Sequence, residues 1–242
     1  LFWVAVWQFS AMAMEQSFLL ASPLETLEKL VGLVPTAAFW QRVGFSALRI
    51  LAGFFSALAV GVVLAAASAW LEPVRVLIRP LMQLIKAVPV ASFIILALLW
   101  VRSANLAVLI SFLMVLPVVY TAVLEGIQQT DRQLLEMAKV FRIPFSRALW
   151  AIWLPQVWPY FVQSCTVGMG LAWKSGIAAE VIGLPDGSIG DALYRAKITL
   201  STGELFAWTF VIILLSAVFE KLFLALLDKA VAAVLGEEGA EK

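Results

Sequence analysis

The sequence contains no histidine and a single cysteine, Cys165, and only 14% of its residues are charged. One cysteine cannot form a disulfide within the chain, and the absence of histidine excludes ordinary zinc sites and His-based catalytic triads. A net charge of +1 gives no field that would attract nucleic acid, so no nucleic-acid partner is expected. No glycine-rich loop with Lys and Ser/Thr is present, so the chain is expected to bind neither ATP nor another cofactor by itself.

Apolar residues are abundant: they make up 63% of the chain, and the mean hydropathy is +0.98. A soluble domain could not bury that much apolar surface. Three uncharged runs, residues 50–71, 103–124 and 148–173, reach the ~20 residues that a helix needs to cross a bilayer core. The predicted fold class is therefore all-α, a polytopic membrane protein with about six transmembrane helices. These spans are expected at residues 1–19, 44–70, 84–101, 104–124, 152–181 and 205–227.

Lys and Arg are unevenly distributed between the two sides that these spans define. The richer side is expected to face the cytoplasm, together with both termini and the segment 125–151. It would carry Arg75, Arg79, Lys86, Arg132, Lys139, Arg142, Arg147, Lys229 and Lys242, against Lys29, Arg42, Arg102, Arg195 and Lys197 on the other side.

Two segments between spans have the signals of short helices. Ser22-Pro23, followed by Glu25, opens an amphipathic stretch that we expect to lie on the membrane surface. In the segment 183–204 the triplet 185–187 (Pro-Asp-Gly) indicates a turn, and a short helix is expected from Asp191 onward.

Residues 131–155, called the motif segment below, place charges between long apolar runs. Apolar residues repeat with helical spacing around residue 138, Ile143-Pro144 interrupts the pattern, and a second helical stretch leads to Leu154-Pro155. Two short helices at an angle would form a compact knob that fits a groove on another protein. The alternative is an ordinary amphipathic helix on the membrane surface, and the spacing alone leaves both interpretations open.

The motif segment resembles the EAA signature of ABC-importer permeases. In that signature Glu-Ala-Ala is followed by a glycine and later by Ile-x-Leu-Pro. Glu136 and Ala138 match its first and third positions, and Ile152, Leu154 and Pro155 match its closing group with the family's spacing.

Two positions depart from the signature. Met137 replaces an alanine, and Arg142 stands where the family usually has the glycine that permits a tight turn. After Ile143, Pro144 offers another way to impose the bend.

The resemblance extends over nearly the whole chain. The stretches ASPLETLEKL, SALRILAGF, LIRPLMQLIKAVPVAS, GLAWKSGIAAEVIG and SIGDALYRA are similar to the nitrate/sulfonate/taurine class of these permeases. The resemblance implies one transmembrane permease domain over residues 1–242 with the type I importer (MetI-like) fold and cytoplasmic coupling helices at about 131–151. The chain would be a transport subunit of the cell membrane rather than an enzyme.

The resemblance also implies partners. A second permease copy would complete the pathway. ATPase subunits, which bind ATP and Mg, would grip the motif segment, with Glu136 as the expected contact. An extracytoplasmic binding protein would deliver a small solute, such as a sulfonate, nitrate or a vitamin precursor.

Three charged residues fall within or beside the predicted spans. Charges in hydrocarbon are costly, so Lys174 and Glu180 need partners or a water-filled path. We expect a contact between Arg49 and Glu180, with outward snorkelling of Arg49 as the alternative. Lys174 would either attract an anion along the pathway or bind exposed carbonyls near Gly168, Gly170 or Gly176.

Two other function classes remain as alternatives. An intramembrane hydrolase would need a nucleophile with a base or paired acids, which this chain does not offer in one place. A membrane anchor or sensor subunit that does not transport could use the same knob.

Overall fold

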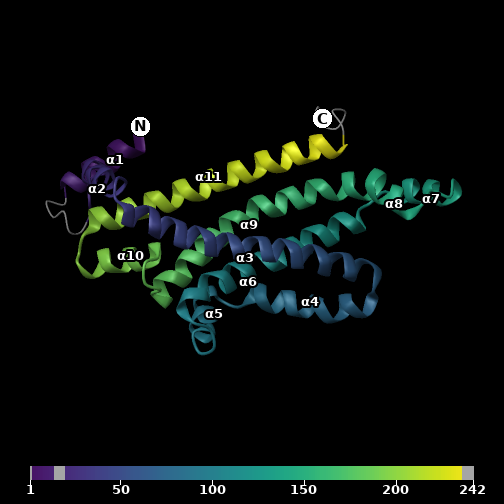
Figure 1. The fold of residues 1–242 in the computed structure, drawn as a ribbon, viewed down its shortest axis with the longest axis horizontal. Helices are drawn as coiled ribbons and strands as arrows, with labels where there is room; N and C mark the ends of the chain where they lie inside the picture. The colour runs from purple at the N-terminus through teal and green to yellow at the C-terminus, as the bar shows by residue number, and fades with distance from the viewer. Residues whose placement is uncertain (1, 14–19, 236–242) are drawn as a thin grey trace. The chain divides into compact units, whose positions relative to one another are not determined.

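The computed structural model describes residues 2–13 and 20–235, and all regular elements in this part of the chain are helices (Figure 1). This confirms the all-α fold class. The elements are α1 Phe2–Ala13, α2 Pro23–Leu33, α3 Ala37–Trp70, α4 Glu72–Ala87, α5 Val90–Ala97, α6 Ser103–Gln128, α7 Arg132–Val140, α8 Phe145–Ala148, the π-helix η1 Leu149–Trp153, α9 Leu154–Gly183, α10 Ile189–Ile198 and α11 Thr202–Leu235.

The contacts divide the chain into two units, and the long helices α3, α6, α9 and α11 contribute to both. Unit 1 comprises Leu1–Ala52, Val90–Ile110 and Trp173–Val218. Unit 2 comprises Gly53–Pro89, Ser111–Ala172 and Phe219–Lys242. Each unit therefore draws on segments that are far apart in the sequence.

Within the described residues, three helical segments are long and apolar enough to cross a membrane: Ala37–Trp70, Ser103–Gln128 and Thr202–Lys229. They confirm the expected spans 44–70, 104–124 and 205–227. The expected span 152–181 does form the 30-residue helix α9, but α9 is not among these three. For the expected span 1–19, α1 covers Phe2–Ala13, whereas residues 14–19 lie outside the described residues, as does Lys242.

The prediction of one continuous span at 84–101 is wrong. The chain breaks between α4 and α5, where Val88 is extended, with φ −80° and ψ 131°. Pro89 causes this break because a proline ring disfavours helical geometry in the preceding residue and offers no N–H to continue the helix. Counting α4 and α5 as one broken span raises the number of apolar spans to four in the described part of the chain, against the six expected.

The two short helices expected outside the spans are confirmed, and side-chain caps define where they begin. Ser22 precedes α2 and accepts a hydrogen bond from the backbone N–H of Glu25 at 3.1 Å. Ser188 caps α10 in the same way, accepting from the N–H of Asp191 at 2.9 Å. Each cap satisfies an N–H that the first helical turn leaves without a partner.

Close helix packing fixes the core of unit 2. Gly61 on α3 lies against Val119 on α6, and a Cβ added at Gly61 would come within 2.9 Å of the valine side chain. Small residues at such positions let helices approach closely, which is the main source of packing energy within a membrane.

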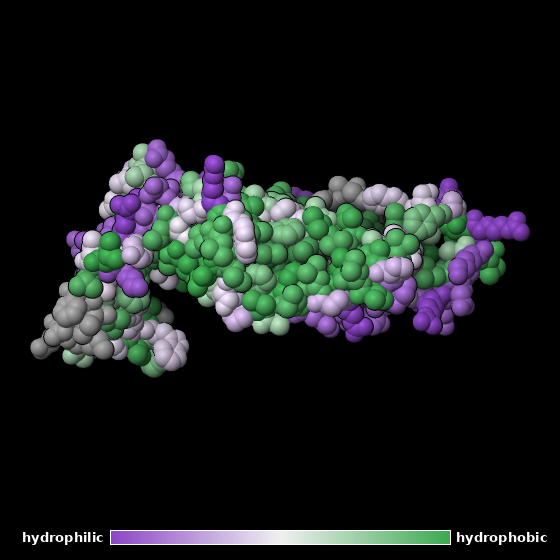
Figure 2. Space-filling view, turned by 90° about the horizontal axis from the view of Figure 1, so that it is seen from below, coloured by the Kyte–Doolittle hydropathy of each residue, from purple (hydrophilic) through white to green (hydrophobic). Residues whose placement is uncertain are grey.

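The outer surface is largely apolar. Only 6% of the Thr202–Lys229 window is buried, and Ile213 and Leu214 are more than half exposed. Figure 2 shows hydrophobic residues over most of the visible face, with hydrophilic residues gathered in separate clusters. Such a surface suits lipid rather than water.

Candidate functional site

Helix α7, the first part of the motif segment, begins at a side-chain cap. Asp131 accepts a hydrogen bond from the N–H of Gln133 at 2.8 Å. The backbone N–H of Asp131 in turn donates to the side-chain oxygen of Gln156, in the first turn of α9, at 2.8 Å. This bond joins the beginning of the motif segment to the residue that follows its end and closes the segment into a compact unit.

Helix α7 ends in a tight turn at Arg142, which has the left-handed φ of +52°. The N–H of Arg142 donates to the carbonyl of Lys139 at 3.1 Å, and the N–H of Ile143 donates to the carbonyl of Ala138 at 2.9 Å. This pair of bonds is the Schellman arrangement, which favours glycine at the left-handed position. The left-handed turn therefore falls at residue 142, where the family usually has glycine, and the arginine adopts this conformation. Pro144 is the residue that precedes α8.

A small apolar core holds the two short helices together. Ala138, Ala148 and Ile152 are buried against one another, and Leu135 and Ile143 pack at the edge. Of the residues matched to the EAA signature, Ala138 and Ile152 thus come together, although fourteen positions separate them in the sequence. A small side chain at 138 lets α7 approach η1 closely.

The π-helix η1, Leu149–Trp153, joins α8 to α9. It precedes Pro155, which lacks an N–H and whose ring would clash with the carbonyl four residues earlier in a regular α-helix. One wider turn accommodates the proline without interrupting the helix. Leu154 and Pro155 therefore belong to the beginning of α9, outside the small core.

The exposed surface of the motif segment carries large apolar side chains beside its charged ones. Val140 is 78% exposed, Phe141 73%, Phe145 60% and Met137 42%. Glu136 is exposed beside them and forms no ion pair in the described part of the chain. Val140 and Phe141 follow Met137 by three and four residues and so share its face of α7, and an exposed apolar patch of this kind marks an interaction surface.

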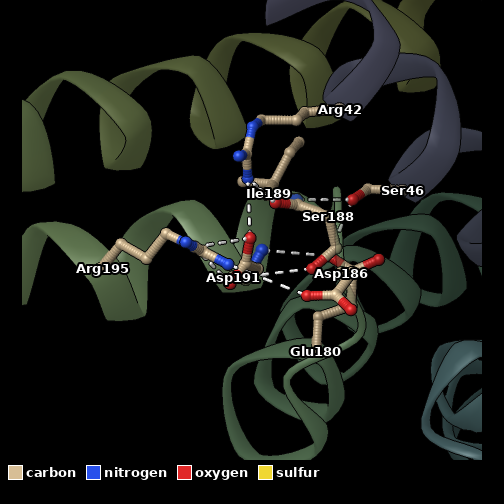
Figure 3. A network of polar contacts seen from close by, with 9 residues as sticks. Arg42, Ser46, Glu180, Asp186, Ser188, Ile189, Asp191 and Arg195 are labelled. Atoms are coloured by element: carbon tan, nitrogen blue, oxygen red, sulfur yellow. Dashed lines mark hydrogen bonds and ion pairs between the residues drawn. The ribbon is translucent and has the colours of Figure 1, made fainter. Parts of the chain in front are cut away.

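A second group of polar residues lies in unit 1, around Asp191 on α10 (Figure 3). The carboxylate of Asp191 accepts from Arg42 Nη1 at 3.0 Å and from Arg195 Nε at 2.8 Å, and its side chain is only 7% exposed. Burial raises the pKa of the Asp191 carboxyl, but the hydrogen bonds and charges of Arg195 and Arg42 outweigh burial and hold this pKa below its usual value. Figure 3 shows Asp191 between the two guanidinium groups.

Glu180 on α9 is fully buried in the same unit. Its Oε2 accepts from the hydroxyl of Ser46 at 2.7 Å and from the backbone N–H of Gly190 at 3.2 Å, whereas its Oε1 has no hydrogen-bond partner among the described residues. The Ser46 hydroxyl also accepts from the N–H of Ile189 at 2.9 Å, so α3, α9 and the beginning of α10 share one polar junction. At Gly190 an added Cβ would lie 2.4 Å from the Cβ of Glu180, so only glycine fits there.

The predicted contact between Arg49 and Glu180 is wrong. Arg49 donates instead to the carbonyl of Ala104 at 2.6 Å and lies over the ring of Phe45, with 3.4 Å between its Cζ and the ring centroid. Ser46 takes the place beside Glu180 that we expected Arg49 to occupy. Ser46 and Arg49 are three residues apart, so they differ in direction by only about 60° around α3. The Ala104 carbonyl and the Phe45 ring hold the Arg49 guanidinium away from Glu180.

Lys174 on α9 is exposed, and its side chain forms neither a hydrogen bond to a carbonyl nor an ion pair within the described ranges 2–13 and 20–235. The structure thus does not contain the expected bonds to carbonyls near Gly168, Gly170 or Gly176. Cys165 is buried, and the described residues contain no cluster of three or more metal-ligating side chains.

Residues 57–233 match the family described as "Binding-protein-dependent transport system inner membrane component". The chain belongs to this family. The match covers the motif segment and most of both units, so the chain is a membrane-embedded permease subunit of an ABC transporter and not an enzyme.

Curated relatives agree with this assignment. The permease is 24% identical to the taurine transport system permease protein TauC of Escherichia coli over 88% of this chain and 80% of the relative. It is 21% identical to the putative aliphatic sulfonates transport permease protein SsuC of Bacillus subtilis over 84% and 74% of the two chains. It is 24% identical to the bicarbonate transport system permease protein CmpB of Synechococcus elongatus, over 60% of this chain and 52% of the relative.

Proposed function

We propose that two copies of this permease form the pathway of an importer for a small anion, in the cytoplasmic membrane. Taurine, aliphatic sulfonates and bicarbonate, named for the relatives, all carry an acidic oxyanion group, and this supports the substrate class. An extracytoplasmic binding protein delivers the solute, and ATPase subunits that bind ATP and Mg drive its passage. The chain folds as one permease domain, and both termini lie in the cytoplasm.

The motif segment carries the proposal. It is a closed knob with its own small core, fastened to α9 by the bond between Asp131 and Gln156, and it exposes Phe141 and Phe145. A rigid knob of this kind transmits motion because it moves as one body with α9. The exposed apolar patch enters a groove of the ATPase, and Glu136 contacts the edge of that groove.

Lys174 is the proposed cation along the pathway. No ion pair or carbonyl bond holds its ammonium in the described part of the chain, and a lysine in contact with lipid tails would cost at least ~2.5–3.5 kcal/mol. A water-filled path or the second copy removes this cost. Arg49 and Glu180, by contrast, have structural partners within unit 1.

The test is reconstitution of the permease with its ATPase and binding protein in vesicles. We expect the ATPase to co-purify with the permease, and the liganded binding protein to stimulate ATP turnover and uptake of the solute. The variant Glu136→Lys should lower uptake, while Lys29→Gln, a change of one exposed charge outside the motif segment, should not. A permease that binds the ATPase but never supports uptake would instead be an anchor or sensor.

A further inference from the structure

Helix α4 carries a stripe of polar residues that have no role in the function proposed above. Its polar residues recur every three or four positions, so at ~100° per residue they fall within about 80° of one another. They are Glu72, Arg75, Arg79, Gln83 and Lys86.

The rest of α4 separates into two apolar faces. Met82 and Ile85 are buried, whereas Leu77, Leu81 and Leu84 are 73%, 47% and 59% exposed on the other side. The buried pair packs inside unit 2 and supplies the one apolar face that a surface helix needs. The exposed leucines form a second apolar face, which suits contact with lipid. The polar stripe lies between these faces and needs water or a polar ligand.

The stripe forms one wall of a groove of about 600 Å³, and helix α6 forms the other. From α6 the groove is lined by Thr121, Glu125, Gln128 and Gln129, and all its lining residues belong to unit 2. At one end the ammonium of Lys86 lies 3.3 Å from the hydroxyl of Thr121.

The contact between Lys86 and Thr121 shows how α4 and α6 are aligned along their lengths. Counting seven residues from Lys86 back to Arg79, and seven from Thr121 on to Gln128, moves about 10 Å along each helix. Because the groove pairs the beginning of α4 with the end of α6, Arg79 and Gln128 lie at roughly the same level. Glu125 lies about one turn nearer to Lys86.

The two arginines of the groove differ in their ion-pair partners. Arg75 forms an ion pair with Glu72, whereas Arg79 forms none in residues 2–13 and 20–235. Two arginines four positions apart on a helix repel one another, and an anion lying over them would relieve this repulsion. A guanidinium beside side-chain amides offers the planar donors that sulfonate, phosphate and carboxylate groups bind.

The geometry points to an oxyanion-binding site in the groove between α4 and α6, with Arg79 as the principal ligand and Gln128 as a second donor. Where the oxyanion is the transported solute, this inference rests on the proposed function and places the site at the cytoplasmic end of the pathway. The carboxylate of Glu125 repels a bound anion, so it weakens binding and favours release of the anion. The same groove chemistry suits the phosphate of an anionic lipid headgroup.

The experiment uses the full chain without its ATPase, in lipid nanodiscs. Buried Cys165 is replaced by alanine, and Gln129→Cys places a thiol at the groove without removing either proposed ligand. The rate of modification by an anionic methanethiosulfonate reagent is divided by the rate for a cationic one. Arg79→Gln should lower this ratio and Glu125→Gln should raise it, each about two- to fivefold for one charge at roughly 7 Å in screened water. Lys229→Gln, which removes an exposed charge outside the groove, should leave it unchanged.

The ligand is then identified by protection of the thiol introduced at position 129 from a neutral thiol reagent. Protection by sulfate in phosphatidylcholine nanodiscs supports the site and assigns it to a dissolved solute. Protection that appears only with phosphatidylglycerol supports the site and assigns it to a lipid headgroup. Arg79→Gln should abolish either protection, and Arg79→Lys should keep the rate ratio while weakening protection, because an ammonium lacks the planar pair of donors.

Absence of protection by both sulfate and phosphatidylglycerol, or a rate ratio that Arg79→Gln leaves unchanged, would overturn the inference. These readouts need no ATPase. A chain that binds an anion in the groove but supports no uptake would therefore refute only the proposed function. A chain that supports uptake but binds no anion in the groove would refute only the oxyanion site.

Discussion

Replacing Arg142 by glycine should stabilise the turn between α7 and α8. Arg142 has φ +52°, a conformation that costs an L-residue other than glycine about 1–2 kcal/mol. Glycine loses about 0.5–1 kcal/mol more conformational entropy on folding, so the expected net gain is about 0.5–1 kcal/mol. Arg142→Val should do the opposite, because a β-branched side chain tolerates this region least, and we expect a loss of about 1 kcal/mol.

The assay is hydrogen exchange at the amide of Ile143, which donates to the carbonyl of Ala138 across the turn. Exchange should slow about two- to fivefold in Arg142→Gly and accelerate about fivefold in Arg142→Val, since 1.4 kcal/mol corresponds to a factor of ten. Leu200, with φ +54° after α10, provides an internal replicate, and Leu200→Gly should slow exchange at Ser201. Faster exchange in Arg142→Gly than in the parent chain would refute the reasoning.

Three further predictions concern particular contacts. Gly190→Ala should lower the unfolding temperature, because the added Cβ meets backbone at 2.5 Å and overpacking costs about 1–3 kcal/mol. Gly32→Ala, whose added Cβ has no described atom within 4 Å, should not. Asp191→Asn should destabilise the chain at neutral pH by about 1–3 kcal/mol through loss of charged hydrogen bonds. Since the folded-state pKa of Asp191 is lowered, this contribution is complete above the unfolded pKa and is lost as the pH falls through the folded pKa, so thermal unfolding of the two chains should converge in acid. Ala138→Leu should disrupt the small core and lower ATPase binding, measured by co-purification, whereas Met137→Leu at an exposed position should preserve the fold.

The sequence predicted those elements whose signals are local. Ser22-Pro23 and Ser188 mark helix beginnings through hydrogen bonds to neighbours within three residues, so the pattern alone suffices. The break at Pro89 was also within reach, but the apolar run on both sides of the proline favoured a single span. The motif segment was predicted as two short helices, and its left-handed turn falls at the position where the family's glycine had been expected.

Features that depend on helix rotation or on distant partners were not predictable in this way. The sequence places Arg49 and Glu180 on neighbouring spans but leaves the direction of each side chain undetermined, and Ser46 is the partner of Glu180 in the structure. The π-helix before Pro155 relieves a clash that the sequence does not locate. The sequence does not indicate the groove beside α4, because Arg75 and Arg79 are assigned to a loop between predicted spans, whereas both lie on a helix.

The proposed function requires that the motif segment faces the cytoplasm and docks into the ATPase. Its most direct test is a photo-crosslinking residue at position 141, where Phe141 is 73% exposed, in the complete complex with permease, ATPase and binding protein. We expect a crosslink to the ATPase from position 141, and none from the same residue placed at Leu24, which is 74% exposed on α2. A crosslink from position 141 to the binding protein, or labelling of that position from outside intact cells, would contradict it.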